Sequence, residues 1–157
     1  VSFDPNLRLK LWSCAQAKSI LIDLMAQADI LLPGLEEAQY ILGVSEPDAI
    51  IEALLALGPR LVALKLGSDG AIIGDKHQIQ HVPAFHVARI VDPFGAGDAF
   101  AAGFLAGWME GLDLVSAGRL GNACGACAMT VTGNIEALPY RNEVTALMAG
   151  SQSVITR

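Results

Sequence analysis

The sequence predicts an α/β fold whose sheet is mostly parallel and covered by helices. Short apolar runs alternate with stretches of helical periodicity, in the order strand, helix, strand, helix, strand, which is typical of layered α/β proteins. The run "RLVALKLG", residues 60–67, is apolar almost throughout, as expected of a strand buried on both faces of the sheet. With 157 residues, 53% of them hydrophobic, the chain is large and apolar enough for one domain with a substantial core.

The predicted elements follow one another along the chain. Apolar, β-prone runs predict strands at residues 1–4, 29–33 and 60–67, and a β-hairpin or meander at residues 71–85. Apolar residues at helical spacing predict helices at residues 13–27, 35–42, 46–57, 98–110, 114–131 and 141–149. Gly43 is the expected end of the second helix, and Ser45 is the expected cap of the third. Lys65 lies inside the third strand and is expected to pair with a carboxylate.

Charge and composition exclude several classes of protein. Ten Lys and Arg residues against sixteen Asp and Glu residues give a net charge of −6, so the chain lacks the basic surface that nucleic acid binding requires. The longest apolar run, residues 99–109, is too short and too rich in glycine to span a bilayer, and we recognise no signal peptide. We therefore expect neither a nucleic acid nor a membrane as partner. The sparse, odd number of cysteines favours a reducing cytoplasm.

Cys124 and Cys127 form a CxxC pair. A second CxxC or a histidine cluster that would complete a zinc site is missing from the sequence, and neither Trp nor Pro gives the pair a thioredoxin-like context. We interpret the two cysteines as small residues on the buried face of a helix.

The stretch "DPFGAGDAF", residues 92–100, carries the strongest functional signal. Gly95 and Gly97 can adopt positive φ and let another molecule approach the backbone. The helix that follows directs free N–H groups at the same place, which favours an anion. Asp98 would lie at the start of this helix, as the N-cap or in the first turn, where the helix dipole keeps its carboxylate ionised.

Three interpretations of Asp98 are open. It can simply cap the helix, a position that Asp favours. A dinucleotide site is disfavoured, because Phe100 breaks the G-x-G-x-x-G pattern and a carboxylate so close to the glycines repels a pyrophosphate. Phosphoryl transfer needs both features at once: backbone donors beside the migrating phosphoryl group, and a carboxylate that takes the proton of the attacking hydroxyl.

These residues resemble a known family. "DPFGAGDAFAAGF" is similar to the second signature of the PfkB (ribokinase-like) carbohydrate kinases. Four further stretches resemble other segments of the family, in the family's order along the chain: "DPNLR", "LPGLEEA", "LKLGSDGA" and "NACGACAMTVTG". The resemblance covers nearly the whole chain but only the C-terminal half of the family's usual length. It implies a three-layer α/β/α ribokinase-like fold, in which residues 1–157 form the nucleotide-binding part of one kinase domain, without the N-terminal sugar-binding and lid half.

The resemblance also implies roles for individual residues. Asp98 would be the catalytic base on the acceptor hydroxyl, beside an anion hole formed by Gly95, Ala96 and Gly97. ATP would be bound by Asn6, Gly67, Ser68, Asp69, Gly70 and Asn122. The acceptor would contact Asp98, Arg8 and Asn134. Mg²⁺ would be held through water by Glu37, because Mg²⁺ prefers oxygen ligands and keeps several waters. A monovalent cation such as K⁺ would lie near Asp92.

The implied activity is ATP-dependent phosphorylation of a sugar or sugar acid hydroxyl. "LPGLEEA" and "GNIEALP" are most similar to 2-keto-3-deoxygluconate kinases, with fructokinase- or ribokinase-type sugar kinases as alternatives. Gly34 departs from the Asn of many members, and Asn134 stands where an acidic residue is expected. A non-catalytic nucleotide-binding fragment is the other alternative. Without the N-terminal half the sugar pocket would be incomplete and apolar helix faces would lose cover, which favours self-association into a homo-oligomer.

Overall fold

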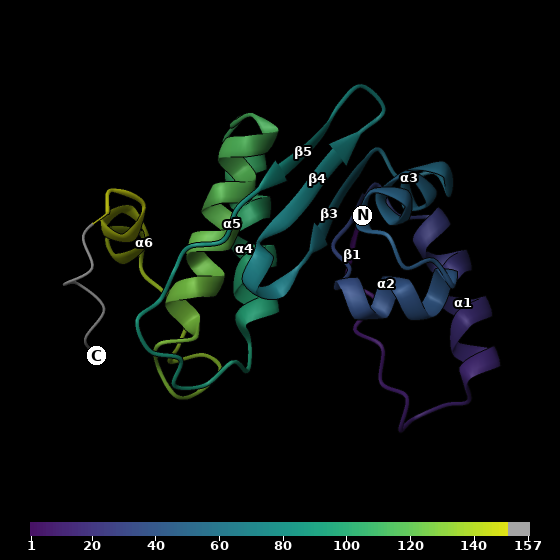
Figure 1. Cartoon of the computed structure of the whole chain (residues 1–157), viewed down its shortest axis with the longest axis horizontal. Helices are drawn as coiled ribbons and strands as arrows, with labels where there is room; N and C mark the ends of the chain where they lie inside the picture. Colours follow the sequence, from purple (N-terminus) through teal and green to yellow (C-terminus); the bar gives the residue numbers. More distant parts are fainter. Residues whose placement is uncertain (151–157) are drawn as a thin grey trace. The chain divides into compact units, whose positions relative to one another are not determined.

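The computed structural model describes residues 1–150. Within this range it contains six α-helices, one 3-10 turn and a five-stranded sheet with the strand order β1-β2-β3-β4-β5 (Figure 1). The chain divides into two compact units, the first formed by Val1–Gly67 with Ala71–His81 and the second by Ser68–Gly70 with Val82–Arg157. No helix of the described range combines the length and apolar character needed to cross a lipid bilayer.

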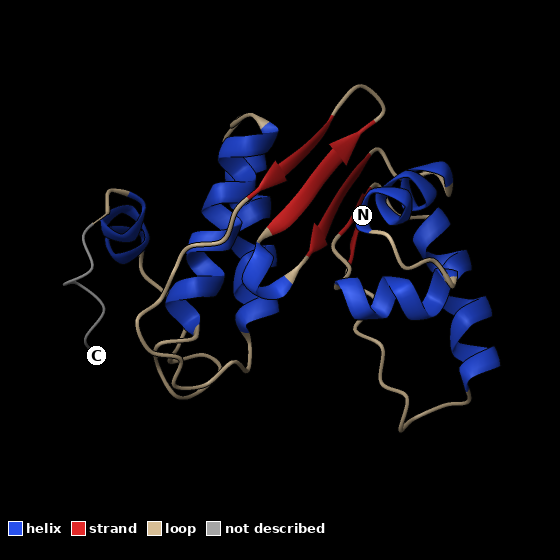
Figure 2. Cartoon of the chain, viewed as in Figure 1, coloured by secondary structure: helices blue, strands red, loops and turns tan. Residues whose placement is uncertain are grey.

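The sheet is parallel over its first three strands and antiparallel at the hairpin (Figure 2). β1 (Ser2–Phe3), β2 (Ile30–Leu31) and β3 (Leu61–Lys65) are joined through helices and run parallel. The next two strands are β4 (Ala71–Asp75) and β5 (Ile79–Val82). Only a short turn separates β3 from β4, and so short a connection allows only antiparallel pairing, with Leu61 opposite Asp75. The predicted α/β sheet with a hairpin is therefore present, as a mixed sheet.

Three helices of the first unit share a core with the sheet. They are α1 (Cys14–Ala26), α2 (Leu35–Leu42) and α3 (Pro47–Ala56). Their apolar faces pack with strand residues that alternate along the chain, among them Val62, Leu64 and Ile72. α2 ends at Gly43, in the left-handed conformation (φ 74°), as predicted. The predicted cap of α3 is wrong by one residue, because Pro47 occupies the first helical position and makes Glu46, not Ser45, the N-cap.

The helices of the second unit are α4 (Ala96–Met109), α5 (Leu114–Ala128) and α6 (Arg141–Met148). α4 and α5 lie side by side and approach closely at glycines (Figure 1). A β-carbon at Gly103 would stand 2.6 Å from Cys124 Sγ, and one at Gly121 would stand 3.0 Å from the carbonyl oxygen of Phe100. Cys127 is buried in a cluster that α5 forms with α6, and Cys124 is half-buried beside it, which agrees with the interpretation of the CxxC pair as packing residues.

Candidate functional site

Asp98 lies in the first turn of α4, with its side chain exposed. The N-cap is Gly95, whose left-handed backbone (φ 78°, ψ −4°) turns the chain into the helix and whose carbonyl accepts the first helical bond, from Ala99 N–H at 2.9 Å. Asp98 is therefore not the cap. Its carboxylate makes no hydrogen bond or ion pair with any residue of the described range, so it is available to a ligand.

Two of the first three amides of α4 are also without backbone acceptors within residues 1–150. Ala96 N–H reaches the carbonyl of Pro93 only at 3.4 Å, and neither Gly97 N–H nor Asp98 N–H has a backbone acceptor within residues 1–150. These groups carry the positive end of the helix dipole. An exposed carboxylate and unused amide donors thus occur in one helical turn.

Two flanking segments adjoin this turn. The side chain of Asn134 lies against Gly95, where a β-carbon would come within 2.5 Å of Asn134 Oδ1. The segment before Gly95 is held by the end of α5, since the N–H groups of Val91 and Asp92 both donate to the carbonyl of Met129, at 2.8 and 3.2 Å. Asp92 Oδ1 accepts from Phe94 N–H at 3.0 Å. The predicted residues Asp92, Gly95 and Asn134 are therefore brought to the same helix start.

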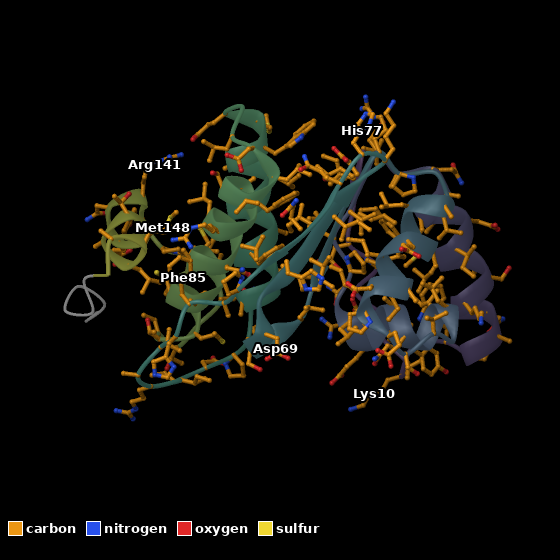
Figure 3. All side chains as sticks on the ribbon, turned by 45° about the horizontal axis from the view of Figure 1, so that its top comes forward. Lys10, Asp69, His77, Phe85, Arg141 and Met148 are labelled. Atoms are coloured by element: carbon orange, nitrogen blue, oxygen red, sulfur yellow. The ribbon has the colours of Figure 1, made fainter. Side chains whose placement is uncertain are left out.

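The predicted nucleotide-binding turn forms the 3-10 segment η1 (Gly67–Asp69) and Gly70. Ser68 and Asp69 are exposed, and Asp69 is labelled in Figure 3. Gly70 has φ 96°, and a β-carbon there would stand 2.1 Å from the carbonyl oxygen of Val82. Because no side chain fits at this position, Gly70 fixes the turn against the backbone of residues 82–84.

Asn122 supports the same segment from α5. Its side chain is buried (8% exposed), and its Nδ2 group donates to the carbonyls of Val82 at 2.9 Å and Pro83 at 3.0 Å. Both amide hydrogens are used, so only Oδ1 is left for any ligand. Asn122 therefore has a structural role that the sequence did not reveal, and its predicted place beside the adenine stays a prediction.

A second group of predicted residues gathers at the carboxyl ends of the parallel strands of the first unit. Lys65, at the end of β3, pairs with Asp4, which follows β1; their Nζ and Oδ2 atoms are 2.5 Å apart and both side chains are largely buried. The expected carboxylate partner of Lys65 is thus Asp4. Asn6 has a left-handed backbone (φ 42°), and both Asn6 and Arg8 are exposed.

Glu37 is engaged with the backbone on both sides. Its Oε1 accepts from Leu7 N–H at 2.7 Å, and its Oε2 accepts from Gly34 N–H at 2.9 Å. No cluster of three or more His, Cys, Asp or Glu side chains in residues 1–150 could cage a metal ion. Glu37 keeps one lone-pair site on each oxygen, which fits contact with Mg²⁺ through water but not a dedicated protein cage.

A surface pocket of about 310 Å³ lies elsewhere in the second unit. Small apolar side chains of α4, including Ala102 and Ala106, line it together with residues of α5 and α6. None of the predicted site residues lines this pocket.

Comparison with known proteins gives one consistent result. The pfkB family carbohydrate kinases match residues 1–141. A 2-dehydro-3-deoxygluconokinase of Bacillus subtilis (strain 168) is 34% identical over 155 residues, which cover 98% of this chain and 48% of that protein.

Solved structures agree in fold. A putative Ribokinase II of E. coli in complex with ATP and Mg²⁺ matches with a TM-score of 0.85 and 31% identity, over 95% of this chain and 48% of that one. A fructokinase of Vibrio cholerae O395, with fructose, ADP and calcium bound, matches with a TM-score of 0.84 and 31% identity, over 94% of this chain and 50% of that one. The chain spans about half the length of the curated relatives it matches. It has the ribokinase-like fold and belongs to the pfkB family of carbohydrate kinases.

Proposed function

We propose that residues 1–157 form the nucleotide-binding and catalytic part of one domain of an ATP-dependent carbohydrate kinase. The observation that carries the proposal is the first turn of α4, where the exposed Asp98 carboxylate stands beside amide groups that have no protein acceptor in the described range. Because Gly95 is the N-cap, capping does not account for the place of Asp98. Phosphoryl transfer needs both the carboxylate and the amide donors.

In the proposed reaction the acceptor hydroxyl oxygen attacks the γ-phosphorus of ATP in line with the leaving group. The bond from the γ-phosphorus to the bridging oxygen breaks, its electron pair leaves with ADP, and the hydroxyl proton passes to Asp98. The anion hole proposed for Gly95, Ala96 and Gly97 binds the charge on the transferring group. Because the Gly97 amide is already oriented by the helix and has no backbone acceptor in the described range, it needs no rearrangement when that charge develops.

ATP is proposed to contact the exposed turn residues Ser68 and Asp69, framed by Gly67 and Gly70, with Asn6 near the phosphates. Gly67 suits a close approach, because it is exposed, has φ 63° and has open space around its α-carbon. Mg²⁺, when bound, neutralises phosphate charge, and Glu37 would meet it only through water. A monovalent cation such as K⁺ is also proposed to lie near Asp92.

The proposed acceptor is 2-keto-3-deoxygluconate, with Arg8 and Asn134 as contacts. An exposed guanidinium suits the carboxylate of a sugar acid. The similarity to a 2-dehydro-3-deoxygluconokinase supports this choice. A ketose such as fructose is the second candidate, because fructokinases match over most of the chain at similar identity.

The test measures ADP release with 2-keto-3-deoxygluconate, fructose and ribose, on this chain and on the longest native form of the protein, together with ATP affinity by calorimetry. The proposal expects ATP binding and turnover with the sugar acid in the longest form. Turnover with fructose alone would make fructose, and not the sugar acid, the acceptor of the proposed reaction. ATP binding without turnover on any sugar would favour the non-catalytic nucleotide-binding alternative, and absence of ATP binding from every form would refute the proposal.

A further inference from the structure

We propose that Lys65 is a positioning residue, which acts on ATP binding through Asp4 and the loop that follows Asp4. This role deepens the proposed function and rests on it in one respect, namely that Asn6 contacts ATP. Its structural part rests on the Lys65–Asp4 ion pair and on the backbone of Asn6 alone.

The ion pair joins the ends of two strands that are not neighbours. Lys65 is the last residue of β3, Asp4 directly follows β1, and β2 lies between these strands in the sheet. The Lys65 side chain therefore reaches across the end of β2, where its own N–H donates to the carbonyl of Pro33 at 2.9 Å. Only 16% of the Lys65 side chain and 25% of the Asp4 side chain are exposed. Because water screens such a pair poorly, each charge depends on the other.

The pair also fixes which carboxylate oxygen faces the loop. Oδ2 of Asp4 is bound to the Lys65 ammonium group, and Oδ1 accepts from Asn6 N–H at 3.3 Å. A bond from an Asp side chain to the N–H two residues later favours a local turn. Asn6 has φ 42°, a left-handed backbone that costs free energy unless neighbouring contacts stabilise it. The exposed Asn6 side chain is thus presented from a backbone that the ion pair holds.

A direct contact between Lys65 and the phosphates is the competing role. The structure favours the indirect role, because the ammonium group is already paired with Asp4 and a direct contact would require this pair to open. The two roles differ in a measurable way. If Lys65 acts through Asp4, its replacement has no further effect once Asp4 has lost its charge, whereas a direct contact keeps its full effect.

The chain offers a matched control at the other end of the same strand. Arg60 directly precedes β3 and pairs with Asp29 at 3.0 Å, but 77% and 46% of these side chains are exposed. Exposed pairs contribute little, because water and salt screen them. Arg60→Met therefore removes a positive charge and an ion pair from β3 without touching the loop of Asn6.

The first experiment measures ATP affinity by calorimetry for the wild type, Lys65→Met, Asp4→Asn, the double variant and Arg60→Met. We expect three- to tenfold weaker binding for Lys65→Met and a change below twofold for Arg60→Met. In the Asp4→Asn background, Lys65→Met should change the affinity by less than twofold. The same loss in both backgrounds would overturn the proposal in favour of a direct phosphate contact. Unchanged affinity of Lys65→Met would also overturn it.

Kinetics separate positioning from a general loss of structure. In the form of the protein that turns over sugar, Lys65→Met should raise the KM for ATP three- to tenfold and leave kcat within twofold of the wild type. A fall in kcat with an unchanged KM would overturn the proposal, because the loop of Asn6 would then not act on ATP binding.

The last experiment needs no ligand. The one-bond coupling between Cα and Hα of Asn6, measured by NMR, reports whether φ is positive. We expect the positive-φ value in the wild type and in Arg60→Met, and a shift towards the value of extended backbone in Lys65→Met; an unchanged coupling would overturn the structural part. If Lys65→Met does not fold, Asp4→Asn breaks the pair from the other side and is tested by the same coupling. A wild type that binds no ATP would count against the proposed function, and the coupling would still decide whether the pair holds the loop.

Discussion

The side chain of Asn134 lies against the α-carbon of Gly95, so closely that a β-carbon at Gly95 would stand 2.5 Å from Asn134 Oδ1. Gly95 also has a left-handed backbone, with φ 78°. Two independent constraints therefore require glycine at the N-cap of α4: the backbone conformation and the neighbouring carboxamide. The amide donors proposed for phosphate begin at this residue, so both constraints also keep side chains away from the proposed anion hole.

Gly95→Ala is expected to lower the free energy of unfolding by more than the conformational strain alone. The left-handed backbone costs Ala about 1–2 kcal/mol, and the overlap with Asn134 adds about 1–3 kcal/mol. Gly43→Ala is the control, because Gly43 has nearly the same φ, 74°, but open space around its α-carbon. Urea unfolding measures the free energy of unfolding of both variants. Adding Asn134→Ala to Gly95→Ala should remove the part of the loss that comes from the overlap with Asn134. Equal losses at the two glycines would show that the Asn134 contact carries no energy.

Asp98→Asn is expected to lower kcat by about 10²–10⁴ with the affinity for ATP nearly unchanged, because the amide cannot take the acceptor's proton. The measurement is steady-state ADP release in the form of the protein that turns over sugar. Asp23→Asn, an exposed carboxylate on α1, is the charge-matched control and should keep full activity. Wild-type turnover by Asp98→Asn would reduce Asp98 to a residue that merely favours the helix start.

The elements that the sequence predicted well are those with a local signal. The start of α4 lies within two residues of its predicted place, because the glycines and the apolar periodicity mark it, and Lys65 stood out as a charge inside an apolar strand. The Leu7–Glu37 and Gly95–Asn134 contacts had no such signal. Each is a contact between a side chain and the backbone of a residue that is distant in sequence. Because every residue has a backbone, the amino-acid type at that position does not indicate that the contact exists.

Asn122→Ala is expected to destabilise the protein by about 2–4 kcal/mol, because it leaves the carbonyls of Val82 and Pro83 without their donor. Denaturant unfolding measures the loss, and Asn142→Ala, at an exposed position of α6, is the control. Because Gly70 packs against the same backbone, the exposed turn at Ser68 and Asp69 should also become more susceptible to proteolysis. An unchanged free energy of unfolding would show that water can replace the Asn122 amide as the hydrogen-bond donor. Asn122 would then have its predicted ligand contact, and not this structural role, as its function.

Cys124 is expected to react slowly with thiol reagents in the native protein. Burial raises the pKa of its thiol to about 11, although the nearby Arg141 acts in the opposite direction. At pH 8 the thiolate fraction is therefore about 100-fold smaller than for a thiol of ordinary pKa. The rate of disulfide exchange with a coloured aromatic disulfide, measured in a Cys14→Ser variant, should rise with pH up to about 11 and should be at least 100-fold faster in urea.

The raised pKa of Cys124 also predicts that the free energy of unfolding falls as pH rises from about 9 towards 11, because the thiol ionises in the unfolded chain at a lower pH than in the folded protein. Rapid reaction of the native protein at pH 8 would contradict the packing role of the CxxC pair and favour a redox role instead.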